Sequence, residues 1–304
     1  MLTVFSIPKP FKGHIGTIQR NAITSWTLLR PRPEIILFGN DEGTAALAQE
    51  LGLRHVPEIA CNEYGTPLLG DLFRQAGRNA DSKYMCYVNA DILLVSDFAR
   101  ALPWVWERQP RFLIVSKRIN LSVTEPLAFE AGWEEAVKAH SRESGVPAGH
   151  TAIDIFVFPK GTYPHVPDFG VGRLWFDQWL IKAAKESGIP VIDLSRVAPL
   201  FHQNHDYNHV AGGSDWIWKG KEAEHNLRLY NAAPHAFTLL DATHELMPDG
   251  TIRRVRFRRS AFQARQFLWR VLVQETQPLR KRLRLHRKPK TPAAPSAEHG
   301  SADA

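Results

Sequence analysis

The chain has 304 residues, of which 44% are hydrophobic and 23% charged, as in ordinary globular proteins. This length is sufficient for one large α/β domain, or two small ones, with a complete core. Its two cysteines, Cys61 and Cys86, exclude a disulfide framework and favour a reducing compartment. No stretch reaches the roughly 18 consecutive apolar residues of a membrane span, and the N-terminus lacks the basic segment of a signal peptide. We therefore expect a soluble, cytoplasmic protein.

Basic residues are concentrated near the C-terminus. Residues 1–250 contain 24 Lys and Arg against 28 Asp and Glu, whereas residues 251–290 contain 14 Lys and Arg against one acid, Glu275. We expect a basic helical extension at 251–277 and a disordered tail at 278–304. Such a segment is suited to bind peripherally to the anionic inner surface of a membrane, because each basic residue near that surface adds about 1 kcal/mol to the binding free energy. A solvated tail is the alternative, and the mildly acidic body makes nucleic-acid binding unexpected.

Apolar runs and helical periodicity alternate through the first hundred residues. Ile18, Ala22, Trp26 and Leu29 recur three and four residues apart, which predicts a helix. The apolar runs are continuous, as expected for strands that are covered on both faces. Together these features predict an α/β fold with a mostly parallel, doubly wound sheet. The expected strands are 2–7, 34–38, a short stretch from 56 and 84–95, and the expected helices are 17–29, 44–51 and 66–76.

The second half of the chain is mixed in pattern. The dipeptide Asp249-Gly250 predicts a tight turn in a hairpin over 243–254. The polar residues of 201–209 predict a loop. Elsewhere the sequence predicts strands at 111–116, 152–158 and 191–194, and helices at 133–140, 174–185, 222–230 and 260–274.

Polar residues follow three of the predicted strands. They lie in Ser6-Ile7-Pro8, Asn40-Asp41 and Asn89-Ala90-Asp91, and ligands of such sheets bind at the carboxyl ends of the strands. A carboxylate such as Asp91, at the end of a buried strand, is costly unless it is paired or binds a cation. Mg²⁺ and Mn²⁺ accept one or two carboxylates together with substrate phosphates. The residues alone leave a second interpretation open, in which Asp91 caps the following turn.

Six stretches of the chain together resemble a known family. The stretch YVNADILL is similar to the metal-binding DxD strand end of GT-A fold nucleotide-diphospho-sugar transferases. The others are IDIFVFPKG, VGRLWFDQWLIKAA, HQNHDYNH, EAEHNLRL and LDATHEL, and with them residues 1–250 resemble family 2-like glycosyltransferases. The resemblance implies a Rossmann-like, single catalytic domain with a nucleotide-binding half at 1–100 and an acceptor half at 101–250. It also implies a nucleotide-sugar donor, an unknown glycan, lipid or small-molecule acceptor, and Mn²⁺ or Mg²⁺.

The resemblance assigns donor and metal roles to particular residues. Asp91 is the expected metal ligand, with Asn89 beside it; the family has Asp at that first position, so one charge is missing here. Asp41 is expected to accept hydrogen bonds from the nucleobase, or else to serve only the turn that it forms with Gly39 and Asn40. Pro8 and Asn40 border the same base.

Arg78 and the histidines of 202–209 complete the expected donor site. Arg78 is expected near the donor diphosphate because guanidinium pairs well with phosphate oxygens, although a solvated helix face is the alternative. His202, His205 and His209 are spaced three and four apart. The resemblance implies that His202 or His205, with His205 preferred, completes the metal shell. A polar lid is the alternative, and Ala211-Gly212-Gly213 would give it a hinge.

Asp177 is the expected catalytic base. It lies among three aromatic residues, whose apolar character is expected to raise its pKa toward a useful range. In the resembled family an acid at the start of an equivalent helix deprotonates the acceptor hydroxyl. The alternative is a buried aspartate paired with Arg173.

Two other functions compete with glycosyl transfer. A sugar-phosphate nucleotidyltransferase shares the topology, but its glycine-rich loop after the first strand is a poor match to residues 8–16. A non-catalytic binder of anionic surfaces would depend on the basic residues of 251–290. The chain has no GxGxxG, GxxxxGK[ST] or GxSxG motif, so dinucleotide oxidoreductases, P-loop NTPases and α/β-hydrolases are not favoured.

Overall fold

Strand β1 (Leu2–Ser6) lies inside the main sheet, and all five of its residues are buried. Successive side chains of a strand point to opposite faces of the sheet. Val4 therefore packs with Trp26 of helix α1 (Gly13–Thr27) in one core cluster. Phe5 packs in the other cluster, with its ring centroid 5.3 Å from that of Phe73 in α3 (Leu69–Asn79). This burial on both faces explains the continuous apolar run in the sequence.

The main sheet has nine strands in the order β13-β12-β10-β6-β9-β4-β1-β2-β3. Most neighbouring pairs are parallel, as the sequence predicted, whereas β9 runs antiparallel to both β4 and β6, and β13 runs antiparallel to β12. The remaining strands are β2 (Glu34–Phe38), β3 (Arg54–Val56), β4 (Tyr84–Val88), β6 (Leu113–Val115), β9 (Ile155–Pro159), β10 (Val191–Asp193), β12 (His244–Leu246) and β13 (Ile252–Arg254).

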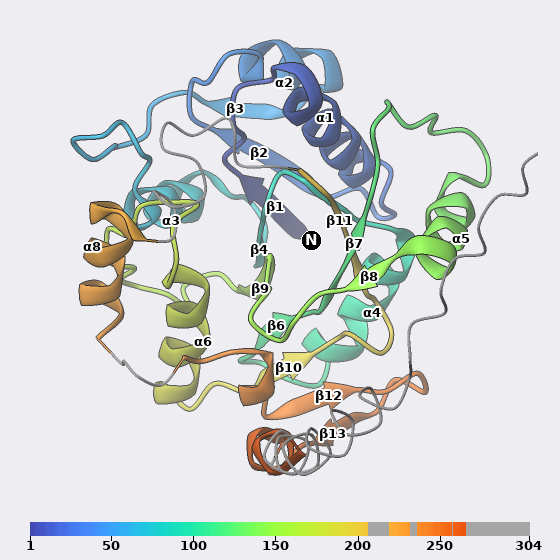
Figure 1. Cartoon of the computed structure of the whole chain (residues 1–304), viewed down its shortest axis with the longest axis vertical. Helices are drawn as coiled ribbons and strands as arrows, with labels where there is room; N and C mark the ends of the chain where they lie inside the picture. Colours follow the sequence, from blue (N-terminus) through green and yellow to red (C-terminus); the bar gives the residue numbers. More distant parts are fainter. Residues whose placement is uncertain (206–218, 232–235, 257, 266–304) are drawn as a thin grey trace, which may run out of the picture. The chain divides into compact units, whose positions relative to one another are not determined.

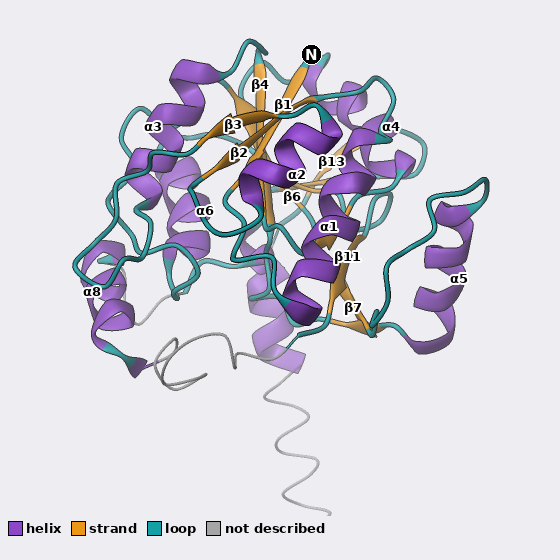
Figure 2. Cartoon of the chain, turned by 90° about the horizontal axis from the view of Figure 1, so that it is seen from above, coloured by secondary structure: helices purple, strands orange, loops and turns teal. Residues whose placement is uncertain are grey.

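Helices cover both faces of this sheet (Figures 1 and 2). One core cluster joins the sheet to α1, α2 (Thr44–Leu51) and α4 (Ser96–Trp106). The other joins it to α3, α6 (Phe176–Glu186) and, through Tyr230, α8 (Lys221–Tyr230). A short 3₁₀ helix, η1 (Leu239–Asp241), precedes β12. The described residues thus form the α/β fold, with a mostly parallel central sheet between helices, that the sequence predicted.

A second sheet of four strands has the order β5-β11-β7-β8. Its core cluster includes Phe201 and is completed by Val137 and Trp133 of helix α5 (Trp133–Ser144). The four strands are β5 (Ile92–Leu93), β7 (Arg118–Leu121), β8 (Val146–Pro147) and β11 (Leu200–Gln203). Because β5 starts immediately after Asp91, this sheet brings β11 to the end of β4.

The structure, a computed structural model, describes residues 1–205, 219–231, 236–256 and 258–265. The chain divides into two units, Met1–Arg256 and Phe257–Ala304, and residues 258–265 of the second are helical. Among the described helices, none combines the length and the hydropathy needed to cross a bilayer.

Several predicted bounds were wrong, and for three of them the contacts give a physical reason. The loop predicted over 201–209 is strand through Gln203, because Phe201 packs into the apolar cluster under α5. Helix α3 begins at Leu69 instead of 66, because Pro67 bridges Cys61. Helix α6 begins at Phe176 instead of 174, because Trp175 has a left-handed φ of 86°.

Candidate active site

A cavity of about 460 Å³ lies at the carboxyl ends of β1 and β4. The entry of β9, strand β11 and the first turn of α6 also contribute to its wall. Concave sites at this edge of an open α/β sheet are where such proteins bind ligands. The charged side chains of its lining are Lys9, Arg118, Arg173, Asp91, Asp154 and Asp177.

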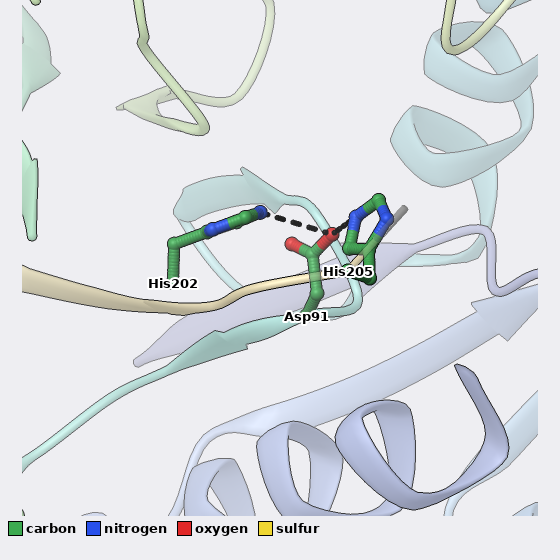
Figure 3. Close-up of side chains that lie close together, drawn as sticks. All are labelled: Asp91, His202 and His205. Carbon is green, nitrogen blue, oxygen red and sulfur yellow. Dashed lines mark hydrogen bonds and ion pairs between the residues drawn. The ribbon is translucent and has the colours of Figure 1, made fainter. Parts of the chain in front are cut away.

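Asp91 and two histidines converge in this cavity (Figure 3). The Nε2 atom of His205 lies 3.1 Å from Asp91 Oδ2, and Nε2 of His202 lies 3.7 Å from the same oxygen. Burial acts to raise the pKa of Asp91, but the histidines and Lys9 outweigh it and hold this pKa well below its ordinary value. Burial also lowers the pKa of His202. The arrangement therefore offers an ionised carboxylate and a neutral imidazole.

Backbone pairing explains how these residues meet. His202 of β11 lies opposite Ile92 of β5 in an antiparallel pair. The backbone N–H of Gln203 and its side-chain amide both donate to the carbonyl oxygen of Asp91, each at 3.2 Å. These bonds join the end of β11 to the residues that follow β4. His205 is two residues beyond Gln203 and therefore lies beside Asp91.

Asn89 is bonded to a different acid. Its Nδ2 donates to Asp154 Oδ1 at 2.8 Å, and its backbone N–H donates to the carbonyl oxygen of Asp154. Both carboxylate oxygens of Asp154 also accept from Arg118, at 2.9 Å each. No hydrogen bond joins Asn89 to Asp91 among the described residues. The side-chain nitrogen of Asn89 is therefore held by the partly buried pair of Asp154 and Arg118, whereas its side-chain oxygen, the atom that would bind a metal, takes no part in these bonds.

Asp177 lies in the first turn of α6 and lines the cavity. Burial raises its pKa to about 7, and the charge of Asp154 adds to this rise. The backbone N–H of Gln178 and the charge of Arg118 oppose it. A carboxyl group that titrates near neutral pH is suited to accept a proton. The alternative of a buried pair with Arg173 is not what the structure contains.

Arg173 is instead held by α8. Its guanidinium lies 2.8 Å from Glu222, whose other oxygen accepts from Asn62 at 2.7 Å. Asn226, one turn further along α8, accepts from the backbone N–H of Gly170 at 2.9 Å and donates to two carbonyl oxygens, those of residues 170 and 174. The ring of Trp175, which has the left-handed φ, stacks on Tyr230 with centroids 5.1 Å apart. Helix α8 thus fixes the turn that leads into α6 and Asp177.

We expect Asn226→Ala to lower the free energy of unfolding by about 2–4 kcal/mol, because it leaves buried backbone groups without partners. Urea denaturation measures this change. His225→Ala, on the exposed side of the same helix, is the matched control and should change stability by less than about 1 kcal/mol. Equal losses in the two variants would contradict the role assigned to Asn226.

Lys9 follows β1 and lines the cavity. Its backbone is fixed by Gln19, whose side-chain amide accepts from the N–H of Lys9 at 2.7 Å and donates to its carbonyl oxygen at 2.8 Å. Burial lowers the pKa of Lys9, and the charge of Asp91 opposes this change. Its ammonium forms no ion pair with any residue that the structure describes. Lys9 is therefore a half-buried cation available to a ligand.

The other residues predicted to border the nucleobase follow the carboxyl ends of β1 and β2. Pro8 is buried between Ile7 and Lys9, which both line the cavity. Asn40 and Asp41 are exposed at the carboxyl end of β2, beside the end of β1.

Arg78 lies away from the metal candidates. It is exposed in the last turn of α3, which leads to the amino end of β4. Asn89 and Asp91 follow the carboxyl end of that strand, at the opposite edge of the sheet. The structure therefore does not bring Arg78 together with them.

Some predictions fall outside the described residues. These include His209, the hinge Ala211-Gly212-Gly213, residues 257 and 266–277 of the basic extension and the whole tail at 278–304.

Sequence reasoning missed part of this site. Lys9 follows the end of strand β1, and the same feature, a polar residue after a strand end, led to the prediction of Asp91. Asp154 stands immediately before an apolar strand; its approach to Asn89 requires that β9 run antiparallel to β4, which the sequence pattern does not reveal. Arg118 is the first residue of β7, a short strand of the second sheet that was not predicted.

No family model matches the chain, and no curated protein matches it. It is similar to several solved structures of low sequence identity. The 1–349 fragment of TarS from S. aureus is 11% identical with a TM-score of 0.45, over 66% of this chain and 60% of that one. A mannosyltransferase from Pyrobaculum calidifontis, in complex with GDP-Man and Mn²⁺, is 15% identical with a TM-score of 0.41, over 66% and 56%.

A third similar structure is glucosyl-3-phosphoglycerate synthase from Mycobacterium tuberculosis, in complex with Mn²⁺, UDP and glucosyl-3-phosphoglycerate. It is 13% identical with a TM-score of 0.41, over 75% of this chain and 77% of that one. This chain spans less than two thirds of the first two structures, and all three TM-scores are below 0.5. The function proposed below therefore depends on the residues of the cavity.

Proposed function

We propose that this protein transfers a sugar from a nucleotide-diphosphate sugar to an acceptor hydroxyl group. The observation that carries this proposal is the placement of Asp177, with a pKa near 7, in one cavity with the Asp91 cluster and the free cation Lys9. The acceptor oxygen attacks the anomeric carbon, its proton passes to Asp177, and the bond to the diphosphate breaks. One cavity then supplies both requirements of the reaction, a base for the acceptor and positive charge for the leaving group.

Lys9 and Arg173 are the proposed contacts for the donor diphosphate. Both line the cavity, and the charge of Arg173 contributes to the lowered pKa of Lys9. Glu222 pairs with Arg173 from α8, so an anion bound in the cavity would be the partner for Lys9. Pro8, Asn40 and Asp41 are proposed to border the nucleobase, because they follow β1 and β2 at the same edge of the sheet.

The residues around Asp91 fit a divalent cation. Asp91 Oδ1 is buried and has no hydrogen-bond partner among the described residues, so this oxygen is available as a ligand. Asp91 and His205 would hold the ion, as predicted. Asn89 remains a proposed donor-site residue, and its side-chain oxygen remains a predicted metal ligand, because only its side-chain nitrogen is bonded to Asp154. A bound cation would offset negative charge on the departing diphosphate.

The test of this function is a screen of nucleotide sugars with Mn²⁺, in which release of the nucleoside diphosphate is measured. We expect at least one donor to be hydrolysed or transferred by the wild-type protein and much more slowly by Asp177→Asn. Pyrophosphate release from a nucleoside triphosphate and a sugar phosphate would instead favour a nucleotidyltransferase.

Lys9→Met is expected to weaken binding of UDP or GDP by about 10- to 100-fold, because a hydrogen bond to a charged group contributes about 1.5–3 kcal/mol. Isothermal titration calorimetry gives the dissociation constants. Arg78→Gln is the comparison, since it removes a cation at the opposite edge of the sheet and should leave binding unchanged. A larger loss of affinity with Arg78→Gln would indicate that the diphosphate binds at α3 instead.

A further inference from the structure

We propose that Asp91, His202 and His205 form a resident site for a borderline transition metal such as Co²⁺ or Zn²⁺. This site binds its metal without nucleotide and discriminates against Mg²⁺. The inference deepens the proposed function, since the site lies in the same cavity, but metal binding is measurable by itself.

The three side chains already have the spacing of metal ligands. One carboxylate oxygen and one nitrogen from each ring lie within 4.8 Å of one another. Metal–nitrogen bonds of about 2.0–2.1 Å place neighbouring ligand atoms about 3.0–3.5 Å apart. The observed separations from Asp91 Oδ2 are 3.1 Å to His205 and 3.7 Å to His202, close to this range.

Two buried polar groups at this site lack partners. His202 lies at 3.7 Å from Asp91, which is beyond hydrogen-bond distance, and its Nδ1 has no partner among the described residues. The same holds for Asp91 Oδ1. Side chains that are this buried are normally hydrogen-bonded, so each exception requires an explanation. A metal bound between Asp91 and Nε2 of His202 would give the carboxylate a partner and His202 the function of a ligand, while Nδ1 lies on the other side of the ring.

The composition of the site decides which metal it prefers. Mg²⁺ requires oxygen ligands, whereas imidazole nitrogen suits the later first-row metals and zinc. Asp91 is the one carboxylate in the cluster. The other nearby acid, Asp154, is paired with Arg118 and bonded to Asn89. The charge of Lys9 interacts with Asp91 and reduces its attraction for any divalent cation equally, so the two imidazoles decide the preference.

The number of protein ligands also determines whether the metal or the donor binds first. A site with one carboxylate depends on substrate phosphates to complete its metal shell. Two imidazoles and a carboxylate are the ligand number of catalytic zinc sites, which hold the metal and leave further positions open. This site is therefore filled before the donor arrives.

The experiment uses the full chain after treatment with a chelator. Mg²⁺, Mn²⁺, Co²⁺ and Zn²⁺ are titrated separately, without nucleotide, by calorimetry, and the visible absorption of the Co²⁺ form is recorded. We expect one ion per chain, with a Co²⁺ or Zn²⁺ dissociation constant at least 100-fold lower than that for Mg²⁺. His202→Asn and His205→Asn should each weaken Co²⁺ binding by about 10- to 100-fold and change its spectrum, whereas His225→Asn, on exposed α8 surface, should not.

The outcomes separate this inference from the proposed function. Tight Co²⁺ binding that requires His202 supports the inference, even if no nucleotide sugar is consumed. Absence of binding without nucleotide, equal affinity for Mg²⁺ and Co²⁺, or an unchanged Co²⁺ spectrum in folded His202→Asn overturns it, even if sugar transfer is observed.

Discussion

Asp177→Asn is expected to lower kcat for sugar transfer by about 10²- to 10⁴-fold, the usual contribution of a general base. Asparagine keeps the shape of the side chain but does not accept the proton of the acceptor hydroxyl. Affinity for the nucleoside diphosphate should remain nearly unchanged, because Asp177 acts on the acceptor. Steady-state rates and calorimetry on the same preparations test both statements.

The pH dependence follows from the pKa of about 7 for Asp177. The base is active when it is ionised, so the wild-type rate should rise as pH increases from 6 to 8. In Asp177→Asn the residual rate should lack this rise. Asp81→Asn, at an exposed acid next to β4, is the control and should keep both the rate and the profile of the wild type. A wild-type rate in Asp177→Asn would exclude the base role.

The stability of the folded protein should fall as pH rises, whereas the rate of transfer should increase. The pKa of Asp177 is higher in the folded protein than the ordinary value of 3.8. Folding is therefore favoured by the protonated form, and stability declines as pH rises from about 4 through about 7. Because asparagine does not ionise, the melting temperature of Asp177→Asn relative to wild type should be higher at pH 8 than at pH 5. A structural pair with Arg173 would predict destabilisation instead.

The fold was largely predictable because its strands are short apolar runs that separate clear helical periodicities. Two predicted elements, the strand 34–38 and the helix 44–51, have the same bounds in the structure, and most others differ by a few residues. Strand direction was harder to predict. An antiparallel β9 and the second sheet depend on contacts between distant segments, which leave no local period in the sequence.

Part of the cavity lining was predictable from one feature, a polar residue that follows a buried strand, which selected Asp91. Asp177, in the first turn of α6, and His205 were selected through the resemblance, and both line the same cavity, although His205 lies 114 positions after Asp91. Arg78 was chosen from its nearness in sequence to β4. A helix that precedes a strand ends at the amino edge of the sheet, so that choice placed the cation at the wrong edge. Lys9, at the end of β1, has the same signal as Asp91.

The second large effect is expected for Asp91→Asn. This change keeps the size of the side chain and removes the one carboxylate of the metal cluster. The wild-type protein should bind UDP or GDP more tightly with Mn²⁺ or Co²⁺ than with a chelator. In the variant this difference should disappear, and sugar transfer should fall by about 10²- to 10³-fold, since a catalytic metal supplies several kcal/mol.

Asp91→Asn also separates a metal site from a purely ionic cluster. If Asp91 served only to pair with His202 and His205, its loss would lower stability at acidic pH, where the imidazoles are charged, and nucleotide binding would not respond to metal in either protein. If Asp91 holds a metal, Asp91→Asn abolishes the metal dependence of nucleotide binding at neutral pH. The melting temperature of the metal-free protein then changes little. Calorimetry with and without metal, on the wild type, on Asp91→Asn and on the control Asp81→Asn, distinguishes the two. Equal metal dependence in all three proteins would remove Asp91 from the metal site, because the amide oxygen of asparagine carries no charge to replace the carboxylate.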